Sequence, residues 1–216
     1  MGWHYKITDR AGWTGVHSQD QEDNAAEVWM WLVDVNGWTE EAAAAVLGNM
    51  QHESYLNPGQ FEIGFNYSMQ HGFGLGQWTP ATKISNYVGS TNHDAMADGA
   101  KQMNYLVSTP SQYTNYYLNP DGTSSYYNES GVPYFSDMDD FSHSTASVRD
   151  LTKTWAICWE KPGSSAYANS ISNRMDDAEY WYGVFTGNPP TPPPTPPSPL
   201  FDDLLWIAIY LSKMLK

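Results

Sequence analysis

The sequence contains a single cysteine, Cys158, among its 216 residues. One cysteine excludes an intrachain disulfide, so the hydrophobic core must hold the fold by itself. The chain can supply such a core, because 41% of its residues are hydrophobic and 15% are aromatic. Cys158 stands in an apolar stretch beside two tryptophans. It is therefore predicted to be a buried structural thiol in one principal domain, and not a nucleophile.

Basic residues are also scarce. Ten Lys and Arg residues stand against 24 Asp and Glu residues, which gives a formal net charge of −14. This charge argues against a nucleic-acid partner, because binding to a phosphate backbone requires a basic patch. Anionic membranes and wall polymers would repel the chain as well, whereas a neutral sugar strand in a cleft would not.

Several functional motifs are absent. A zinc-binding His-Glu-x-x-His helix beginning at His52 would need a histidine where Leu56 stands. There is no Gly-x-x-x-x-Gly-Lys phosphate loop, and His71, His93 and His143 are too scattered to predict a metal site. We therefore expect no metal and no other cofactor. The first residues contain no apolar run typical of a secretory signal peptide, so a protein that works outside the cell would have to get there by another route.

Composition divides the chain into four parts. Residues 1–23 lack a clear period and are interpreted as an aromatic N-terminal arm, and residues 24–187 form the main predicted domain. Proline dominates residues 188–199, which predicts an extended linker. Residues 200–216 are nearly apolar and would form a helix of about 25 Å, marginal for a bilayer core of about 30 Å. A docking or self-association helix is favoured there, with an interfacial or spanning membrane helix as alternatives.

Hydrophobic periodicity predicts that the main domain is mostly helical. Asn24 is the expected N-cap of a first helix that ends at Asn36 and Gly37. Thr39 is the expected N-cap of a second, alanine-rich helix that ends before Pro58. Further helical segments are predicted at 80–107, with a break near 89–92, at 147–160 and at 166–185.

Two stretches differ from this helical pattern. Residues 57–78 are rich in Gly, Asn and aromatic residues, and they predict a small hairpin or an irregular lobe. Residues 110–145 are rich in Tyr, Ser, Asn and Gly, which predicts long surface loops. Exposed tyrosines in such loops are common in carbohydrate contact, and loops packed by their own tyrosines are the alternative.

Glu53 stands at the end of the second predicted helix, next to the lobe. Partial desolvation of a carboxyl at such a position would keep a proton available near neutral pH. A glycosidase needs that proton to convert the departing sugar oxygen into a leaving group. Position alone favours a structural role instead, in which Glu53 forms an ion pair at a helix end.

A second motif, Gly-Leu-Gly-Gln-Trp, begins at Gly74. Its glycines allow backbone to approach a ligand, Gln77 offers an amide and Trp78 offers a stacking face. The sequence Glu-Ser at Glu53, followed by Asn-Pro and by this Gly-Leu-x-Gln motif, resembles the signature of goose-type lysozymes and lytic transglycosylases. The phrases LGNMQHESYLNPGQFE, HGFGLGQWTPATK and FSHSTASVRDLTKTWAICWEKPG resemble the phage tail lysozyme family more closely, over about residues 24–186.

The resemblance implies a mainly α fold of the α+β lysozyme-like kind, with a small β-hairpin lobe flanking the cleft. It implies that the β-1,4 bonds of the peptidoglycan glycan strand are cleaved, with Glu53 as the general acid. Ser54 is then expected to orient the Glu53 carboxyl. Gln77, Trp78 and Glu62 are expected to bind or orient the substrate.

The family segment aromatic-Glu-Arg-Pro is matched here by Trp159, Glu160, Lys161 and Pro162, with lysine in place of the usual arginine. Trp159 and Glu160 are interpreted as structural or cleft-wall residues, with a direct catalytic role as the alternative.

The sequence does not identify the second carboxylate that would act together with Glu53. Asp137, Asp139 and Asp140 lie in a loop that could face Glu53, and Glu62 lies near the cleft lobe. A carboxylate that holds water would allow inverting hydrolysis, whereas without one a substrate hydroxyl could attack and give an anhydro product. Each of these acids could also be a solvated loop charge.

Two functions of different classes are compatible with this sequence. The first is a phage enzyme that acts on the bacterial wall during infection, from the virion tail, or at lysis after release from the host cytoplasm. The second is a catalytically silent virion structural or wall-binding protein with the same fold. In either case residues 200–216 could attach the protein to phage tail proteins or to a membrane.

Overall fold

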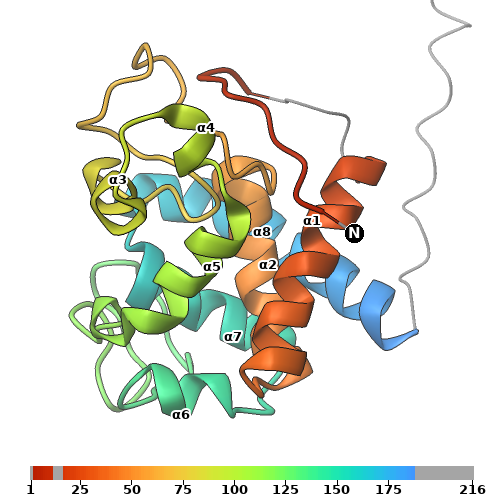
Figure 1. Ribbon diagram of the computed structural model, residues 1–216. Helices are drawn as coiled ribbons and strands as arrows, with labels where there is room; N and C mark the ends of the chain where they lie inside the picture. The colour runs from red at the N-terminus through yellow and green to blue at the C-terminus, as the bar shows by residue number, and fades with distance from the viewer. Residues whose placement is uncertain (1, 12–16, 188–216) are drawn as a thin grey trace, which may run out of the picture.

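The computed structural model describes residues 2–11 and 17–187, and this part of the chain is mainly helical, as predicted (Figure 1). The α-helices are α1 (Gln19–Trp29), α2 (Glu40–Ser54), α3 (Thr82–Val88), α4 (His93–Met96), α5 (Gly99–Ser108), α6 (Met138–Ser142), α7 (Val148–Trp155) and α8 (Ser164–Thr186). Three further helical turns are η1 (Met30–Val35), η2 (Pro110–Gln112) and η3 (Ala156–Glu160).

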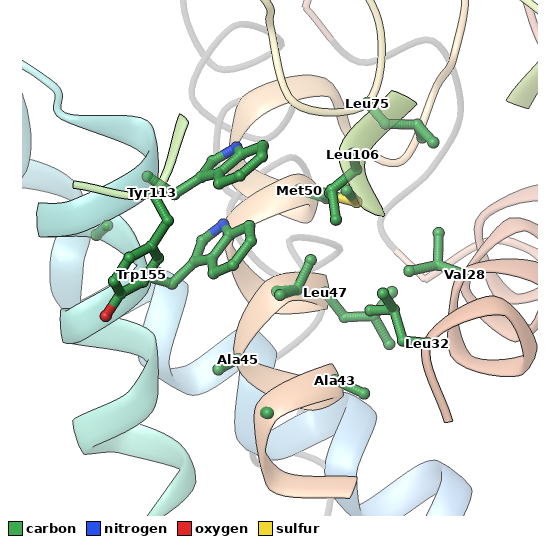
Figure 2. Packing of buried hydrophobic residues seen from close by; sticks show 14 of the residues in the cluster. Val28, Leu32, Ala43, Ala45, Leu47, Met50, Leu75, Leu106, Tyr113 and Trp155 are labelled. Atoms are coloured by element: carbon green, nitrogen blue, oxygen red, sulfur yellow. The ribbon is translucent and has the colours of Figure 1, made fainter. Parts of the chain in front are cut away.

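Helix α2 is the centre of the domain. It makes its most extensive contacts with α8 and α7. Its alanines are fully buried along with Leu47. Figure 2 shows Val28 of α1, Leu32 of η1 and Trp155 of α7 gathered around α2. A helix that is apolar on nearly all sides must be covered on all sides, which explains its central place.

Helices α2 and α8 approach each other closely at Gly48. A side chain at this position would collide with the backbone carbonyl of Arg174 and with Ala178. The missing side chain therefore lets the two helix backbones come together. This approach places the Arg174 side chain beside the last two turns of α2, where it contacts Asn49 and Glu53.

The first helix begins earlier than predicted. Helix α1 starts at Gln19 after the N-cap Ser18, so the prediction that Asn24 is the N-cap is wrong. Asn24 is fully buried inside α1, and its side-chain amide donates hydrogen bonds to the carbonyl oxygens of His4 (2.7 Å) and Leu56 (2.8 Å). Long-range hydrogen bonds have here overridden the local capping preference of asparagine.

The other predicted helices agree with the structure. Thr39 caps α2 by accepting a hydrogen bond from the Ala42 amide. The predicted break near residues 89–92 separates α3 from α4, and the last two predicted helices correspond to α7 with η3 and to α8. Cys158 is buried, as predicted, and burial raises the pKa of its thiol to about 11.

Residues 57–78 form an irregular lobe. The small β-hairpin expected there is not seen, since none of the described residues belongs to a strand. Phe61 pairs with Phe73 through one isolated antiparallel bridge. Between them the backbone turns left-handed, with φ of 86° at Gly64 and 59° at Tyr67, which interrupts the extended conformation that a hairpin needs.

Two predicted elements, the linker at 188–199 and the apolar helix at 200–216, lie outside the described residues. In the ranges 2–11 and 17–187, no helix combines the length and the apolar character needed to cross a membrane.

Candidate active site

A pocket of about 690 Å³ opens where the C-terminal end of α2 meets the lobe. Its walls come from the end of α2, the lobe with Thr79, Lys83 of α3, residues 111–114 and residues 159–162. Four residues expected to be catalytic or to bind substrate line it, namely Glu53, Glu62, Gln77 and Trp78, and so does the segment from Trp159 to Pro162. The tertiary structure therefore brings the two sequence motifs together in one cavity.

Glu53 is held in place by an arginine from the last helix. The Arg174 guanidinium donates through Nη2 to the Glu53 carboxyl, with a nitrogen to oxygen distance of 2.5 Å. The Arg174 side chain is only 3% exposed, against 19% for Glu53. Its remaining N–H groups donate to the side-chain oxygens of Asn49 (2.9 Å) and Ser170 (3.1 Å). These bonds satisfy the buried charge and fix the orientation of the guanidinium.

The position of Glu53 is electrostatically costly. It lies in the last turn of α2, where the helix macrodipole carries partial negative charge and disfavours an anion. A partly buried carboxylate at this end needs a compensating cation, and Arg174 supplies one. Arg174 is the only basic residue of α8, within a strongly acidic chain. A lone basic residue in an otherwise acidic and neutral helix was the sequence signal that could have indicated the contact of Arg174 with Glu53, and the motif analysis missed it.

Glu160 also lines the pocket, at the C-terminal end of η3. Its Oε1 accepts a hydrogen bond from the indole N–H of Trp155, at 3.1 Å. Burial raises the pKa of Glu160 well above its ordinary range, and the negative charge of Glu53 raises it further, while Arg174 opposes the shift. The sequence interpretation of Glu160 as a cleft-wall residue agrees with its place in the same pocket as Glu53.

Ser54 has a different set of contacts from those expected. Its buried hydroxyl donates to the carbonyl oxygens of Leu75 (3.0 Å) and Met50 (3.1 Å). The bond to Leu75 joins the end of α2 to the Gly-Leu-Gly-Gln-Trp loop. Ser54 therefore ties the two motifs together, and Arg174 is the side chain that orients Glu53.

Gln77 and Trp78 both belong to the pocket wall, in different ways. Gln77 has a left-handed backbone, with φ of 43°, and its amide nitrogen donates to the carbonyl oxygens of Gln60 (3.0 Å) and Gly74 (3.1 Å). Trp78 is only 3% exposed, so it does not offer the broad stacking face expected from the sequence. Gly76 lies over the Trp78 ring, and a Cβ added there would lie 3.2 Å from it.

Glu62 is the acid that the lobe contributes to the pocket. Its Oε2 accepts a hydrogen bond from the Gly72 amide at 2.9 Å and lies 3.3 Å from Nδ1 of His71. Its side chain is 40% exposed. The structure thus leaves Glu62 available to a ligand in the same cavity as Glu53 and Gln77.

The aspartates at 137, 139 and 140 do not line this pocket. Asp137 is the N-cap of α6 and accepts a hydrogen bond from the Asp140 amide. Helix α6 lies at the other end of α2, because the N-cap Thr39 donates through its backbone amide to the carbonyl of Ser142. Glu53 lies 14 residues further along α2, which at about 1.5 Å per residue is roughly 20 Å away.

The described parts of the chain contain no group of three or more His, Cys, Asp or Glu side chains arranged to hold a metal ion. The histidines at 71 and 143 each lie beside one acidic residue instead. The polar groups of the pocket include three carboxyl groups, the amide of Gln77 and two lysines, Lys83 and Lys161, and Arg174 contacts one of the carboxyls.

The chain is similar to known phage proteins. Morphogenesis protein 1 of Bacillus phage B103 is 31% identical over 153 residues, which cover 70% of this chain and 36% of that protein. This chain thus corresponds to little more than a third of the relative's length. The profile of the phage tail lysozyme family matches residues 23–185, from α1 to the end of α8, and so includes every segment that lines the pocket. The chain belongs to the phage tail lysozyme family.

Proposed function

We propose that the protein is a phage peptidoglycan hydrolase that cleaves β-1,4 glycosidic bonds of the glycan strand, with Glu53 as the general acid. The observation that carries this proposal is the carboxyl of Glu53 in an open pocket, held there by the buried guanidinium of Arg174. Membership of the phage tail lysozyme family supports the same conclusion. A carboxyl fixed in this way is suited to proton transfer, which depends first on geometry.

The pocket suits a largely uncharged sugar strand. Although the chain is strongly acidic, Lys83 and Lys161 line the pocket together with Glu53, Glu62 and Glu160. These charges partly offset one another, so polar groups in the cavity can bind sugar hydroxyl and amide groups by hydrogen bonds. Gln77 and Glu62 project from the lobe side and are the proposed substrate-orienting residues.

In the proposed reaction, Glu53 donates a proton to the glycosidic oxygen while the bond from that oxygen to the anomeric carbon breaks. The electron pair stays on the departing sugar. A hydroxyl group then bonds to the anomeric carbon: water gives hydrolysis, and a hydroxyl of the sugar itself gives an anhydro product. Glu62 and Glu160 are the other acids that line the pocket and could assist this attack, whereas Asp137, Asp139 and Asp140 are not among its lining residues.

The test is glycan cleavage by the full chain and by Glu53→Gln. Wild-type protein is expected to clear a peptidoglycan suspension and a zymogram, and E53Q is expected to lose about 100-fold or more of the rate. A matched control is E179Q, because Glu179 is exposed on α8 and pairs only with Arg149 among the ion pairs of the described residues. Mass spectrometry of the products then distinguishes hydrolysis from anhydro formation.

A second candidate is a virion structural or wall-binding protein without catalysis. The relative in Bacillus phage B103 is named a morphogenesis protein, which favours a role in phage assembly for that protein. Wild-type protein that binds peptidoglycan but does not clear it would favour this second function. Clearing that depends on Glu53 would favour the enzyme, acting from the virion tail or after release at lysis.

We also propose that residues 24–187 form the catalytic domain and that residues 200–216, beyond the 188–199 linker, attach the protein to tail proteins or a membrane. A chain that stops at residue 187 is expected to keep the specific rate of glycan cleavage. Loss of cleavage by this shortened chain, with an unchanged circular dichroism spectrum, would contradict the accessory role of the C-terminal segment.

A further inference from the structure

The pocket wall offers a ligand little apolar surface. Its two tryptophans are covered, since Trp78 is 3% and Trp159 is 7% exposed. Among the described residues that line the pocket, Ile63 of the lobe is the large hydrophobic residue that stands open to solvent, at 51% exposure. Ligand sites combine apolar surface with a few placed polar groups. Ile63 is therefore the apolar surface that a ligand in this pocket can reach.

Phe65, two residues further along the lobe, is a second exposed apolar side chain, at 44% exposure. Its ring stacks on the His71 imidazole, with ring centroids 3.7 Å apart and an angle of 17° between the planes. Such a stack covers one face of the Phe65 ring and fixes its orientation. Ile63 and Phe65 together are called the lobe rim below.

His71 joins the lobe rim to the carboxylate of the pocket. Its Nδ1 lies 3.3 Å from Oε2 of Glu62, which lines the pocket beside Ile63. Glu62 and Gly72 also exchange two hydrogen bonds: the Glu62 amide donates to the Gly72 carbonyl, and the Gly72 amide donates to Glu62 Oε2, both at 2.9 Å. These contacts close the loop of residues 63–71, so one imidazole braces both the Phe65 ring and the Glu62 carboxylate.

This combination of groups fits a sugar ring. A carboxylate accepts hydrogen bonds from hydroxyl groups, and the C–H faces of a sugar pack on apolar side chains. An anionic polymer or lipid surface is disfavoured at Glu62, because the whole chain carries a net charge of −14. The cavity of about 690 Å³ has the size of a site for one small ligand, so a strand of many sugars must continue over its edge.

We propose that the lobe rim binds the apolar face of one sugar ring of the glycan strand while Glu62 accepts hydrogen bonds from sugar hydroxyl groups. His71 is the positioning residue that holds Glu62 and Phe65 for this contact. The inference rests on the function proposed above and names a part of its substrate site. It assigns to Ile63 and Phe65 the stacking role that the sequence had suggested for Trp78.

Sugar binding without cleavage is the first test. The ligand is a soluble β-1,4-linked tetramer of N-acetylglucosamine, and the E53Q background prevents its turnover during calorimetric titration. I63S and F65A are each expected to weaken binding about tenfold, because partial burial of an apolar side chain stabilises a complex on this scale. F65Y should bind as E53Q alone does, and so should the control V35S, since Val35 is 59% exposed in η1. Unchanged affinity in both I63S and F65A, or no binding by E53Q itself, would overturn the proposal.

Methyl NMR places the contact with the side chain intact. In E53Q protein with ¹³C-labelled isoleucine methyl groups, the Ile63 signal is assigned by its loss in I63V. It is expected to move as the tetramer is added, whereas the signals of Ile84 and Ile157, which are fully buried, should not. A bound tetramer that leaves the Ile63 signal unmoved would overturn the proposal, as would binding of some other partner as the sole cause of a shift.

The role of His71 is tested by separating KM from kcat in glycan cleavage. H71A is expected to raise KM about fivefold and to leave kcat within about twofold, and H71Q, which keeps a donor, should recover part of the KM. Because His71 acts partly through Glu62, the effects of H71A and E62Q on KM should be less than additive in the double variant. Fully additive effects, or a fall in kcat at unchanged KM, would contradict the positioning role.

The two proposals fail in distinguishable ways. If wild-type protein cleaves no glycan but the tetramer binds and shifts Ile63, the proposed enzyme activity is wrong and the lobe rim is still a sugar site. If glycan is cleaved while I63S and F65A keep the wild-type affinity and KM, only the lobe rim is wrong. If F65A does not fold, I63S at its exposed position and the Ile63 methyl titration decide.

Discussion

The two ends of α2 both carry acidic side chains, and they have opposite physical characters. At the N-terminal end, Glu40 and Glu41 occupy the first turn, where the helix dipole favours negative charge. Asp137, nearby on α6, caps that helix and is exposed to solvent. At the C-terminal end, Glu53 is partly buried and faces the unfavourable end of the dipole.

This comparison shows which acids are candidates for chemistry. An exposed carboxylate that caps a helix stabilises local structure, and capping is enough to account for its position. A carboxylate held where the dipole and desolvation both oppose it requires a specific partner, and here Arg174 comes from 121 residues further along the chain. The mismatch between Glu53 and its local environment therefore indicates function better than the number of acids in a loop does.

The largest expected effect follows from removing the partner at the C-terminal end. Arg174→Ala leaves the partly buried Glu53 without its cation and the buried Asn49 oxygen without its donor, so we expect the free energy of unfolding to fall by about 3–5 kcal/mol. Chemical denaturation measures this. The matched control is R149A, because Arg149 pairs with Asp176 and Glu179 at the surface and should cost about 1 kcal/mol or less. Equal losses in the two variants would contradict a special role for Arg174.

The second effect is a pH dependence. The folded-state pKa of Glu160 is raised above an unfolded value of about 4.3, so ionisation destabilises the folded state. Wild-type stability is therefore fully present below about pH 4 and falls as the pH rises through the raised pKa, by at most about 1.4 kcal/mol per pH unit. E160Q should lack this part of the slope in denaturation curves between pH 4 and 9. Parallel slopes for wild type and E160Q would contradict it.

A smaller loss is expected at Ser54, where the two motifs meet. Ser54→Ala leaves the buried carbonyl of Leu75 without its donor, at a cost of about 1–3 kcal/mol. Because the bond anchors the loop that carries Gln77, we also expect weaker glycan binding, measured as a higher KM. S54C, which keeps a weak donor, should be affected less. A variant with unchanged stability and KM would show that the tie between α2 and the loop is dispensable.

The smallest effect is expected at the N-terminal end of α2. Asp137→Ala removes the cap of α6 and should cost about 1 kcal/mol, with no change in glycan cleavage. D137N should recover most of the stability, because asparagine also caps helices. A loss of glycan cleavage in D137A at full stability would contradict the assignment of a purely structural role to this end of α2, since it would place the second carboxylate in this loop.

Local sequence rules predicted most of the helices. Thr39 as the N-cap of α2 and the break after Gly89 depend on backbone preferences within a few residues, and both are present. Asn24 has the same local preference but forms hydrogen bonds with residues 20 and 32 positions away, which no local rule includes. The hairpin was expected from alternating aromatics, but left-handed turns between them limit the pairing to one bridge.

The candidate site likewise contains residues that local motifs predicted and contacts that only long-range packing determines. Glu53 and Gln77 were found because each stands in a short motif, and the structure places both in one pocket. The contact expected for Ser54 was assigned to the wrong partner, since a motif does not show which way a side chain points. Trp78 was expected to stack on a sugar, and its burial beneath Gly76 follows from packing that the motif does not contain.

The sequence by itself determined the helical character, the core without disulfides and the place of Glu53 at a helix end, because periodicity, capping and residue chemistry are local properties. Only the tertiary structure decided that Arg174 contacts Glu53, that Glu160 lines the same pocket and that the aspartates near α6 are at the far end of α2. These relations depend on how close α2 and α8 approach at Gly48, and that distance is set by long-range packing.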